Sequence, residues 1–287
     1  MAQRVSVFGC GGQKGGTTTL HAYLCGHRGL TAPTRKETHF FDDEAQDWSR
    51  PDYRRYDTFY PGDDGGRLRV DVTPIYGYWE PSLARIRAYN PEAKLIFLWR
   101  DPFQRAQSHW AMQVARGAET LSFSEALAAE EKRLAEAGPL GKGRRLHSYV
   151  DRGRYASQLR RAYALFPRAQ ILNLRSEDLF KAHMDTLNRI ATFLGIAPFA
   201  RVEARHEMKR RGRKDAPPRR ADFNFVASRL AGEMAEFATL SGLDISGWSE
   251  PPAEVPSVPQ AAPKESSVRA PNHQPRDSRK IRNFRKT

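Results

Sequence analysis

The sequence predicts a single α/β domain with a mainly parallel central sheet flanked by helices. Four short apolar segments, at residues 5–8, 67–71, 94–99 and 170–174, have the length and composition of buried strands. Segments with helical periodicity separate them, at residues 18–26, 81–89, 103–116, 124–135, 153–165 and 181–194, and a last helix is expected near 222–241. Strands that alternate with helices favour parallel order. The 287 residues are 39% hydrophobic, which suffices for one sizeable core.

The first strand leads into a glycine-rich loop that has the composition of an anion cradle. Its functional residues are Gln13, Lys14, Gly15, Gly16, Thr17, Thr18 and Thr19. Glycines let the backbone approach an anion closely, and the helix that follows supplies unpaired N–H groups. A standard nucleoside triphosphate loop has its lysine after the last glycine. Here Lys14 precedes Gly15 and Gly16, so we expect a different phosphate ligand.

Two further segments carry chemistry-bearing residues. The first is Lys-Glu-Thr-His-Phe-Phe-Asp at residues 36–42. The second begins with the strand at 94–99 and continues as Arg-Asp-Pro-Phe-Gln-Arg-Ala-Gln-Ser at residues 100–108. Arg100 is expected at the carboxyl end of this strand, where open α/β sheets bind ligands. Pro102 can open a helix, which would place Ser108 nearly two turns along it.

Together these motifs resemble those of the PAPS-dependent sulfotransferases, in the branch that contains heparan-sulfate-type and related bacterial enzymes. The glycine loop resembles K-x-G-T-[ST], residues 36–42 resemble KExHFFD, and residues 100–108 resemble RDPxxRAxS. Segments at 152–159, 170–179 and 242–248 also resemble the family in the same order. The resemblance spans roughly residues 5–248 and implies a P-loop-NTPase-like sulfotransferase fold. It also implies transfer of a sulfuryl group from 3′-phosphoadenylyl sulfate (PAPS) to a hydroxyl, or as second choice an amine, of a carbohydrate or small metabolite.

The resemblance assigns roles to individual residues. The loop would bind the 5′-phosphosulfate, with Lys14 beside the leaving group, while Arg100 and Ser108 would hold the 3′-phosphate. An Arg100–Asp101 ion pair is the alternative for Arg100. Glu37 is the first choice for the acceptor base and His39 the second. Lys36, Phe41, Asp71 and Tyr76 are expected to contact the acceptor, although Lys36 could instead balance Glu37, and Asp71 could be a strand-end cap. Val72 stands where the 3-O-type enzymes often have lysine, which argues against that particular branch.

A basic cluster at residues 209–214 includes Arg211, Gly212 and Arg213. Sulfotransferases commonly close the nucleotide site with a basic loop in this region, so these residues are candidates to bind the PAP portion of the donor. The alternative is a solvated loop. No group of His, Cys or carboxylate residues has metal-ligand spacing, and we expect no metal.

The domain is expected to span residues 1–250, followed by a disordered, basic and proline-rich tail at 251–287. This tail has seven prolines, and its eight Lys and Arg residues outnumber three Asp and Glu residues. The absence of a long apolar run, and only two cysteines, favour a cytoplasmic protein without membrane insertion. The net charge of +14 allows a basic nucleic-acid-binding protein as one alternative, but the charge is spread and not organised with aromatic residues. A metal-dependent nucleotide kinase is the other alternative, which the position of Lys14 argues against.

Overall fold

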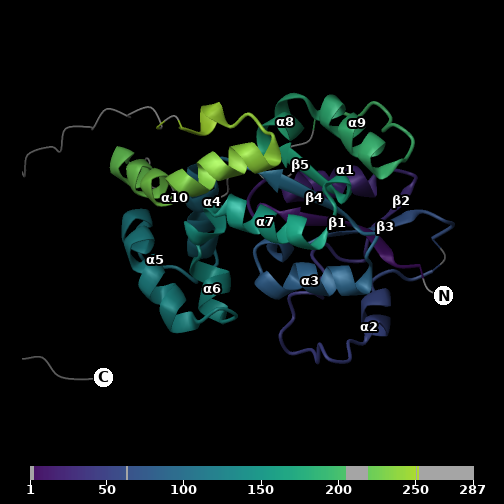
Figure 1. The fold of residues 1–287 in the computed structure, drawn as a ribbon, viewed down its shortest axis with the longest axis horizontal. Coiled ribbons are helices and arrows are strands. Elements are labelled where there is room, and N and C mark those ends of the chain that lie inside the picture. The colour runs from purple at the N-terminus through teal and green to yellow at the C-terminus, as the bar shows by residue number, and fades with distance from the viewer. Residues whose placement is uncertain (1–2, 63, 205–218, 250, 252–287) are drawn as a thin grey trace, which may run out of the picture. The chain divides into compact units, whose positions relative to one another are not determined.

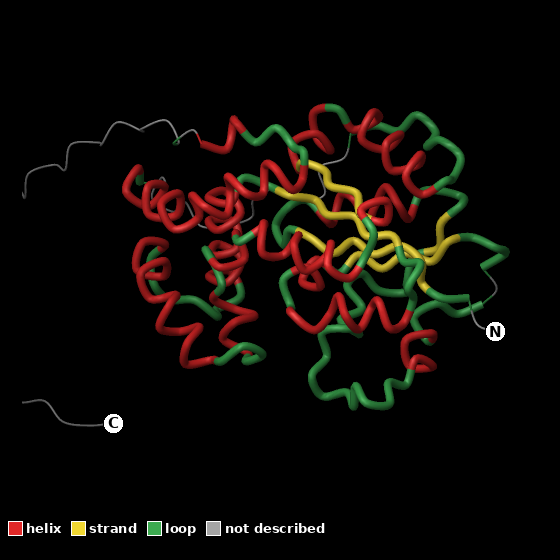
Figure 2. Tube along the Cα trace, in the orientation of Figure 1, coloured by secondary structure: helices red, strands yellow, loops and turns green. Residues whose placement is uncertain are grey.

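A computed structural model describes residues 3–62, 64–204, 219–249 and 251. Its central layer is a β-sheet, drawn in yellow in Figure 2. The sheet has five strands in the order β2-β3-β1-β4-β5, and all neighbouring strands are parallel. The strands are β1 Val5–Gly11, β2 Leu30–Thr31, β3 Leu68–Val72, β4 Lys94–Trp99 and β5 Ile171–Arg175. Because β1 lies between β3 and β4, the chain winds outward in both directions from β1. The loops that follow β1 and β4 therefore leave the sheet at a switch point, where such sheets bind ligands.

Helices cover both faces of this sheet (Figure 1). They are α1 Thr17–Cys25, α2 Tyr53–Asp57, α3 Glu80–Tyr89, α4 Pro102–Ala115, α5 Phe123–Ala137, α6 Lys142–His147, α7 Tyr155–Leu165, α8 Ser176–Lys181, α9 His183–Leu194 and α10 Arg220–Ser241. On one face, Leu20 of α1 and Ile190 of α9 pack with Val7 of β1. On the other, Ile86 of α3 and Leu159 of α7 belong to the cluster that contains Phe8 of β1.

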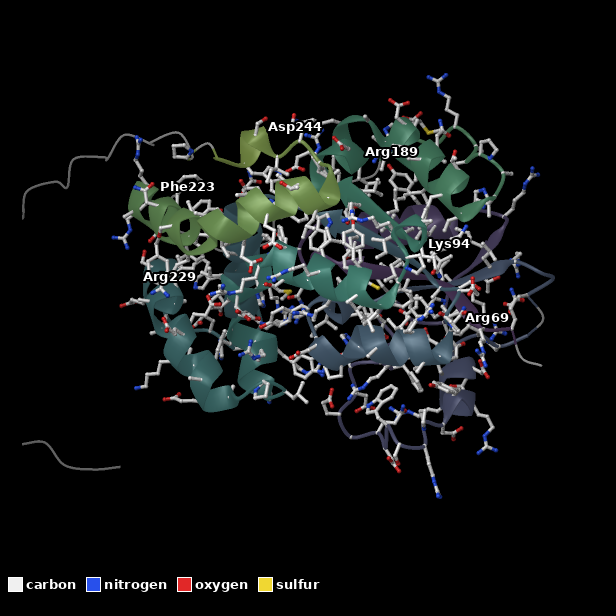
Figure 3. All side chains as sticks on the ribbon, viewed as in Figure 1. Arg69, Lys94, Arg189, Phe223, Arg229 and Asp244 are labelled. Carbon is white, nitrogen blue, oxygen red and sulfur yellow. The ribbon has the colours of Figure 1, made fainter. Side chains whose placement is uncertain are left out.

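A third apolar cluster joins α4, α5 and α10 beside the sheet. Phe103 of α4 makes edge-on contacts with Phe123 and Phe223, at centroid distances of 5.9 and 5.4 Å. Figure 3 labels Phe223 and Arg229 on α10, and Arg229 donates a hydrogen bond of 3.0 Å to Glu131 of α5. This cluster fixes α4, the helix that follows the Arg100 segment.

The predicted fold class is confirmed, and the four predicted strands lie within a few residues of β1, β3, β4 and β5. The short elements β2, α2 and α6 were not predicted, because two to six residues show no readable periodicity. The helix predicted at 181–194 corresponds to α9, which begins two residues later, at His183, because Ala182 adopts φ −134° and separates α8 from α9. Among the described residues, no helix is both long and apolar enough to cross a membrane.

Candidate active site

The loop between β1 and α1 lies directly on β4, and its glycines are required by that contact. Gly12 has φ +64°, and a Cβ atom on it would lie 2.0 Å from the carbonyl oxygen of Leu98. A Cβ atom on Gly15 would lie 2.5 Å from the same oxygen. Gly16 precedes α1 with φ +89°. Side chains at these positions would push the loop off the sheet and out of its cradle shape.

The first turn of α1 follows this loop and has no side-chain cap. Gly16 at the N-cap position offers no capping oxygen, and no acidic residue lies in the first turn. The first N–H groups of a helix have no partner within the helix and carry the positive end of its dipole. Thr17 and Thr19 are buried beside them, and Thr18 is half-buried. The geometry fits an anionic group such as a phosphate or phosphosulfate.

Positive side chains gather around the loop. Lys14 is half-buried, and burial together with the charges of Arg116 and Arg100 lowers its pKa. Arg100, at the end of β4, donates to the backbone oxygen of Lys14 at 3.1 Å. Asp101 instead caps α4, accepting from Gln104 N at 2.7 Å. Cations held this close to one another are stabilised by an anion placed among them.

Other predicted donor-site residues lie on neighbouring elements. Gln13 accepts a hydrogen bond from Arg152, which is 3% exposed. Ser108 is half-buried on α4. The pKa of the adjacent His109 is lowered mainly by burial and by the charge of Arg152, and the charge of Lys14 adds a smaller effect. The residues Arg211, Gly212 and Arg213 lie outside the described part of the chain. Arg116 and Arg152 were not assigned from sequence, because their approach to the loop depends on how the end of α4 and the turn at Asp151–Gly153 pack.

The base segment, Lys36–Asp42, carries both base candidates and is not extended. Glu37 and His39 adopt φ +59° and +54°, which is left-handed backbone and not strand conformation. The reason lies between them: buried Thr38 donates a hydrogen bond of 2.7 Å to Asp71, which turns its neighbours outward. The two side chains nevertheless meet, with His39 Nε2 3.6 Å from Glu37 Oε2.

The charges of this segment form a continuous chain of partners. Lys36 Nζ contacts Glu37 Oε1, and His39 Nδ1 lies 3.0 Å from Asp42 Oδ2. Burial opposes ionisation of Glu37, but His39 and Lys36 outweigh it and lower its pKa to about 2. Hydrogen bonds to Asp42 and Glu37 raise the pKa of His39 to about 9. At neutral pH the segment therefore presents an ionised Glu37 beside an imidazolium.

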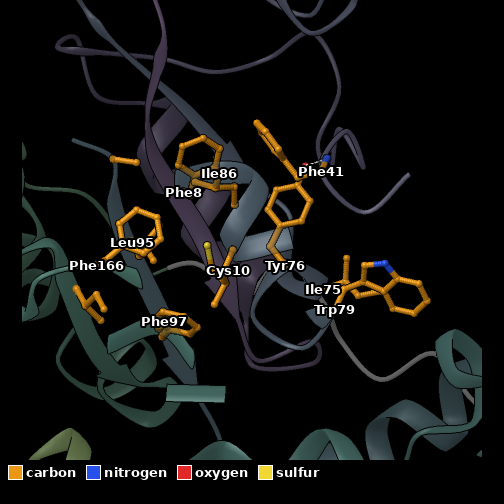
Figure 4. Packing of buried hydrophobic residues seen from close by; sticks show 14 of the residues in the cluster. Phe8, Cys10, Phe41, Ile75, Tyr76, Trp79, Ile86, Leu95, Phe97 and Phe166 are labelled. Carbon is orange, nitrogen blue, oxygen red and sulfur yellow. Dashed lines mark hydrogen bonds between the residues drawn. The ribbon is translucent and has the colours of Figure 1, made fainter. Parts of the chain in front are cut away.

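Three residues predicted to contact the acceptor are buried instead. Phe41, Asp71 and Tyr76 are each 0% exposed. Phe41 packs edge-on against Tyr76 and Phe8 inside the core, which Figure 4 shows from close by. Direct contact with an acceptor is contradicted by this burial. Of the four substrate-contact predictions, Lys36 alone is half-buried at the surface of the site.

Asp71 holds the base segment onto the sheet. Its carboxylate accepts hydrogen bonds from the hydroxyls of Thr38, Tyr56, Thr73 and Tyr76, at 2.7 to 3.1 Å. Tyr76 in turn accepts from the backbone N–H of Phe40 at 3.1 Å. Burial raises the pKa of Asp71, and the four hydroxyl groups oppose this effect. Through these hydrogen bonds Asp71 positions the base segment from within the core, next to β1.

Comparison with known proteins identifies the family. Residues 6–210 match the family model described as a sulfotransferase domain, and the chain belongs to that family. Human heparan sulfate glucosamine 3-O-sulfotransferase 3B1 is 30% identical over 189 residues, which cover 65% of this chain and 45% of the human protein. Human bifunctional heparan sulfate N-deacetylase/N-sulfotransferase 2 is 26% identical over 198 residues, covering 66% and 22% respectively.

A solved structure agrees over most of the fold. The sulfotransferase from Alicyclobacillus acidocaldarius is 26% identical, with a TM-score of 0.73, covering 87% of this chain and 100% of that one. The chain thus matches a whole bacterial sulfotransferase, whereas it spans less than half the length of the two human relatives.

We predict that His39 is an imidazolium at neutral pH and titrates near 9, well above the ordinary value of about 6.5. Because folding raises this pKa, its contribution to stability is complete below about pH 6.5 and is lost as the pH rises through about 9. Side-chain NMR measures the titration, with His39→Gln to assign the resonance. Asp42→Asn should lower the pKa by removing the nearest anion. Wild-type titration near 6.5 would contradict this charge arrangement.

Proposed function

We propose that the chain is a PAPS-dependent sulfotransferase that sulfates a hydroxyl of a carbohydrate or small metabolite. One observation carries the proposal: the cationic loop and the ionised carboxylate lie within range of each other's charge. Lys14 is close enough to Glu37 and Lys36 for their charges to affect its pKa. A donor phosphate bound at the loop would therefore lie within reach of an acceptor beside Glu37. Positioning of two reactants in this way is the main task in transfer of such groups.

The donor fits the residues around the loop. The Gly12–Gly16 turn and the N-terminus of α1 suit the 5′-phosphosulfate, because they offer backbone N–H groups and no acidic side chain. Arg100 and Ser108 are proposed to hold the 3′-phosphate. The residues of the 209–214 cluster are proposed to cover the nucleotide, and the tail at 251–287 to be disordered. The cluster and residues 252–287 of the tail lie outside the described residues. We propose that donor binding needs no metal.

Bound PAPS would supply the sulfuryl group, whose bond to the bridging phosphate oxygen breaks as the bond to the acceptor oxygen forms. Glu37 accepts the proton of the acceptor hydroxyl. Lys14 and the loop N–H groups stabilise the negative charge on the leaving phosphate oxygen. Lys36 contacts Glu37 and can balance charge between this carboxylate and the leaving phosphate group.

Glu37 is favoured over His39 as the base. A general base needs a free lone pair, and His39 is directed at Asp42 through Nδ1 and toward Glu37 through Nε2. With a pKa of about 9 it carries a proton on both nitrogens at neutral pH. Glu37 is ionised there, and nearby donor phosphates would raise its pKa toward a value better suited to accept a proton. His39 then acts by positioning Glu37.

The acceptor is proposed only as a class, and labelled PAPS against a panel of glycans, phenols and amines would identify it. We also propose a cytoplasmic location, which the free thiols of Cys10 and Cys25 support.

We predict that the chain binds PAP in excess EDTA and that Arg100→Ala weakens this binding by about 1.5–3 kcal/mol, the worth of a charge-assisted phosphate contact. Calorimetry measures both affinities. Arg160→Ala is the matched control, because it removes the same charge from an exposed position on α7 that pairs with Glu236. Tight binding of ATP with Mg²⁺ and none of PAP would reject the proposed donor. Unchanged affinity in Arg100→Ala would place the 3′-phosphate elsewhere.

We predict that Glu37→Gln lowers kcat by at least about 100-fold while PAP affinity is retained, because the amide keeps the shape but cannot accept a proton. His39→Gln should cause a smaller loss. The acid limb of kcat/KM, which reports the free enzyme, should lie well below pH 4.3 if Glu37 is the base. A limb near 9, the pKa of His39, or a Glu37→Gln enzyme with wild-type kcat, would eliminate Glu37.

A further inference from the structure

A single arginine from α6 clamps the acidic end of the base segment. Arg145 Nη1 donates to the carboxylate of Asp42, and Nη2 donates to the backbone oxygen of the same residue. The Asp42 side chain is 1% exposed, so this clamp is made in a largely dry environment. Hydrogen bonds between charged groups are strong under these conditions. Arg145 thus fixes both the side chain and the backbone of Asp42.

Arg145 itself is held by two further contacts. Its guanidinium lies 3.9 Å from the ring centroid of Trp79, a side chain that is 1% exposed. Its backbone oxygen accepts a hydrogen bond of 2.9 Å from buried Arg152. Arg152 also donates a hydrogen bond to Gln13 of the loop between β1 and α1. A residue locked by packing and by hydrogen bonds can set the position of its own partner.

We propose that Arg145 is a positioning residue for the acceptor base, acting through Asp42 and His39 on the orientation of Glu37. Each link is a contact of the structure: Arg145 to Asp42, Asp42 to His39 Nδ1 at 3.0 Å, and His39 Nε2 to Glu37 at 3.6 Å. Glu37 and His39 also hold left-handed backbone, which needs support from their surroundings. The inference rests on the proposed sulfuryl transfer, since it assigns a role in that reaction.

The charges agree with this order of contacts. Burial alone would raise the pKa of Asp42, but hydrogen bonds to His39 and Arg145 lower it. Asp42 therefore stays ionised between two cations. Without Arg145, Asp42 would lose the contact that fixes its backbone, and His39 would be held by a carboxylate free to move. Misplacement of a reacting group by about 1 Å can cost about 100-fold in rate.

A double-mutant cycle tests the proposal. With the best acceptor from the panel above, Arg145→Ala should lower kcat by about 10- to 100-fold, with PAP affinity within about twofold of wild type. In a His39→Ala background the same change should lower kcat by less than about twofold, because the link it acts through is already gone. Arg145→Lys should retain more activity than Arg145→Ala, since it keeps the charge.

Arg144→Ala is the matched control on the same helix. Arg144 pairs with Asp151 at 2.8 Å and not with the base segment, so its effect on kcat, whatever its size, should be equal in the wild-type and His39→Ala backgrounds. An Arg145→Ala enzyme with wild-type kcat, or with equal losses in both backgrounds, would overturn the proposal. Arg145→Lys takes its place in the cycle if Arg145→Ala does not fold.

Unfolding free energies of the same variants separate this inference from the proposed function. If no acceptor is sulfated and PAP does not bind, the proposed function fails. The stability cycle between Arg145 and His39 still reports whether the two are coupled through Asp42. Additive stabilities would overturn the linkage in any case, and non-additive stabilities would support it.

Discussion

The site depends on left-handed backbone at three residues. Among the described residues, the non-glycine positions with positive φ are Lys14, Glu37 and His39, which are also the three candidates for direct chemistry. Side chains with a Cβ atom resist this conformation, at a cost of about 1–2 kcal/mol for each residue. The residues around them supply the constraint. Gly12 and Gly15, which flank Lys14 in the chain, press against the carbonyl of Leu98. Thr38, which lies between Glu37 and His39, is anchored to Asp71.

This constraint brings unlike charges together from separate parts of the chain. The β1–α1 loop presents Lys14, the end of β4 presents Arg100, and the base segment presents Glu37. Buried Asp71 holds the base segment from within the core, because four hydroxyl groups donate hydrogen bonds to its carboxyl group there. The candidate anion cradle and the ionised Glu37 are thereby brought within range of each other's charge, which is the preorganisation that the proposed group transfer needs.

The sequence predicted the sheet and the position of the donor loop well, because long apolar strands and a glycine-rich turn leave local patterns. It predicted poorly what depends on packing. Phe41, Asp71 and Tyr76 were assigned to the acceptor, yet they are buried, since the hydroxyl partners of Asp71 come from four different positions. Arg145 was not assigned at all, because its contact with Asp42 spans 103 residues. The roles of Lys14, Glu37, His39, Arg100 and Ser108 stay predictions. The first four of these residues lie in one region of the structure.

Comparison of Lys14→Gly with Lys14→Ala tests the central claim most directly. Both changes remove the amine, so their difference in unfolding free energy isolates the backbone. At an ordinary position alanine is the more stable of the two by roughly 0.5–1 kcal/mol. With φ +73° at this residue, glycine should instead be the more stable by about 1 kcal/mol. Urea unfolding gives the sign. An alanine variant as stable as the glycine variant, or more stable, would contradict a site built on constrained left-handed backbone.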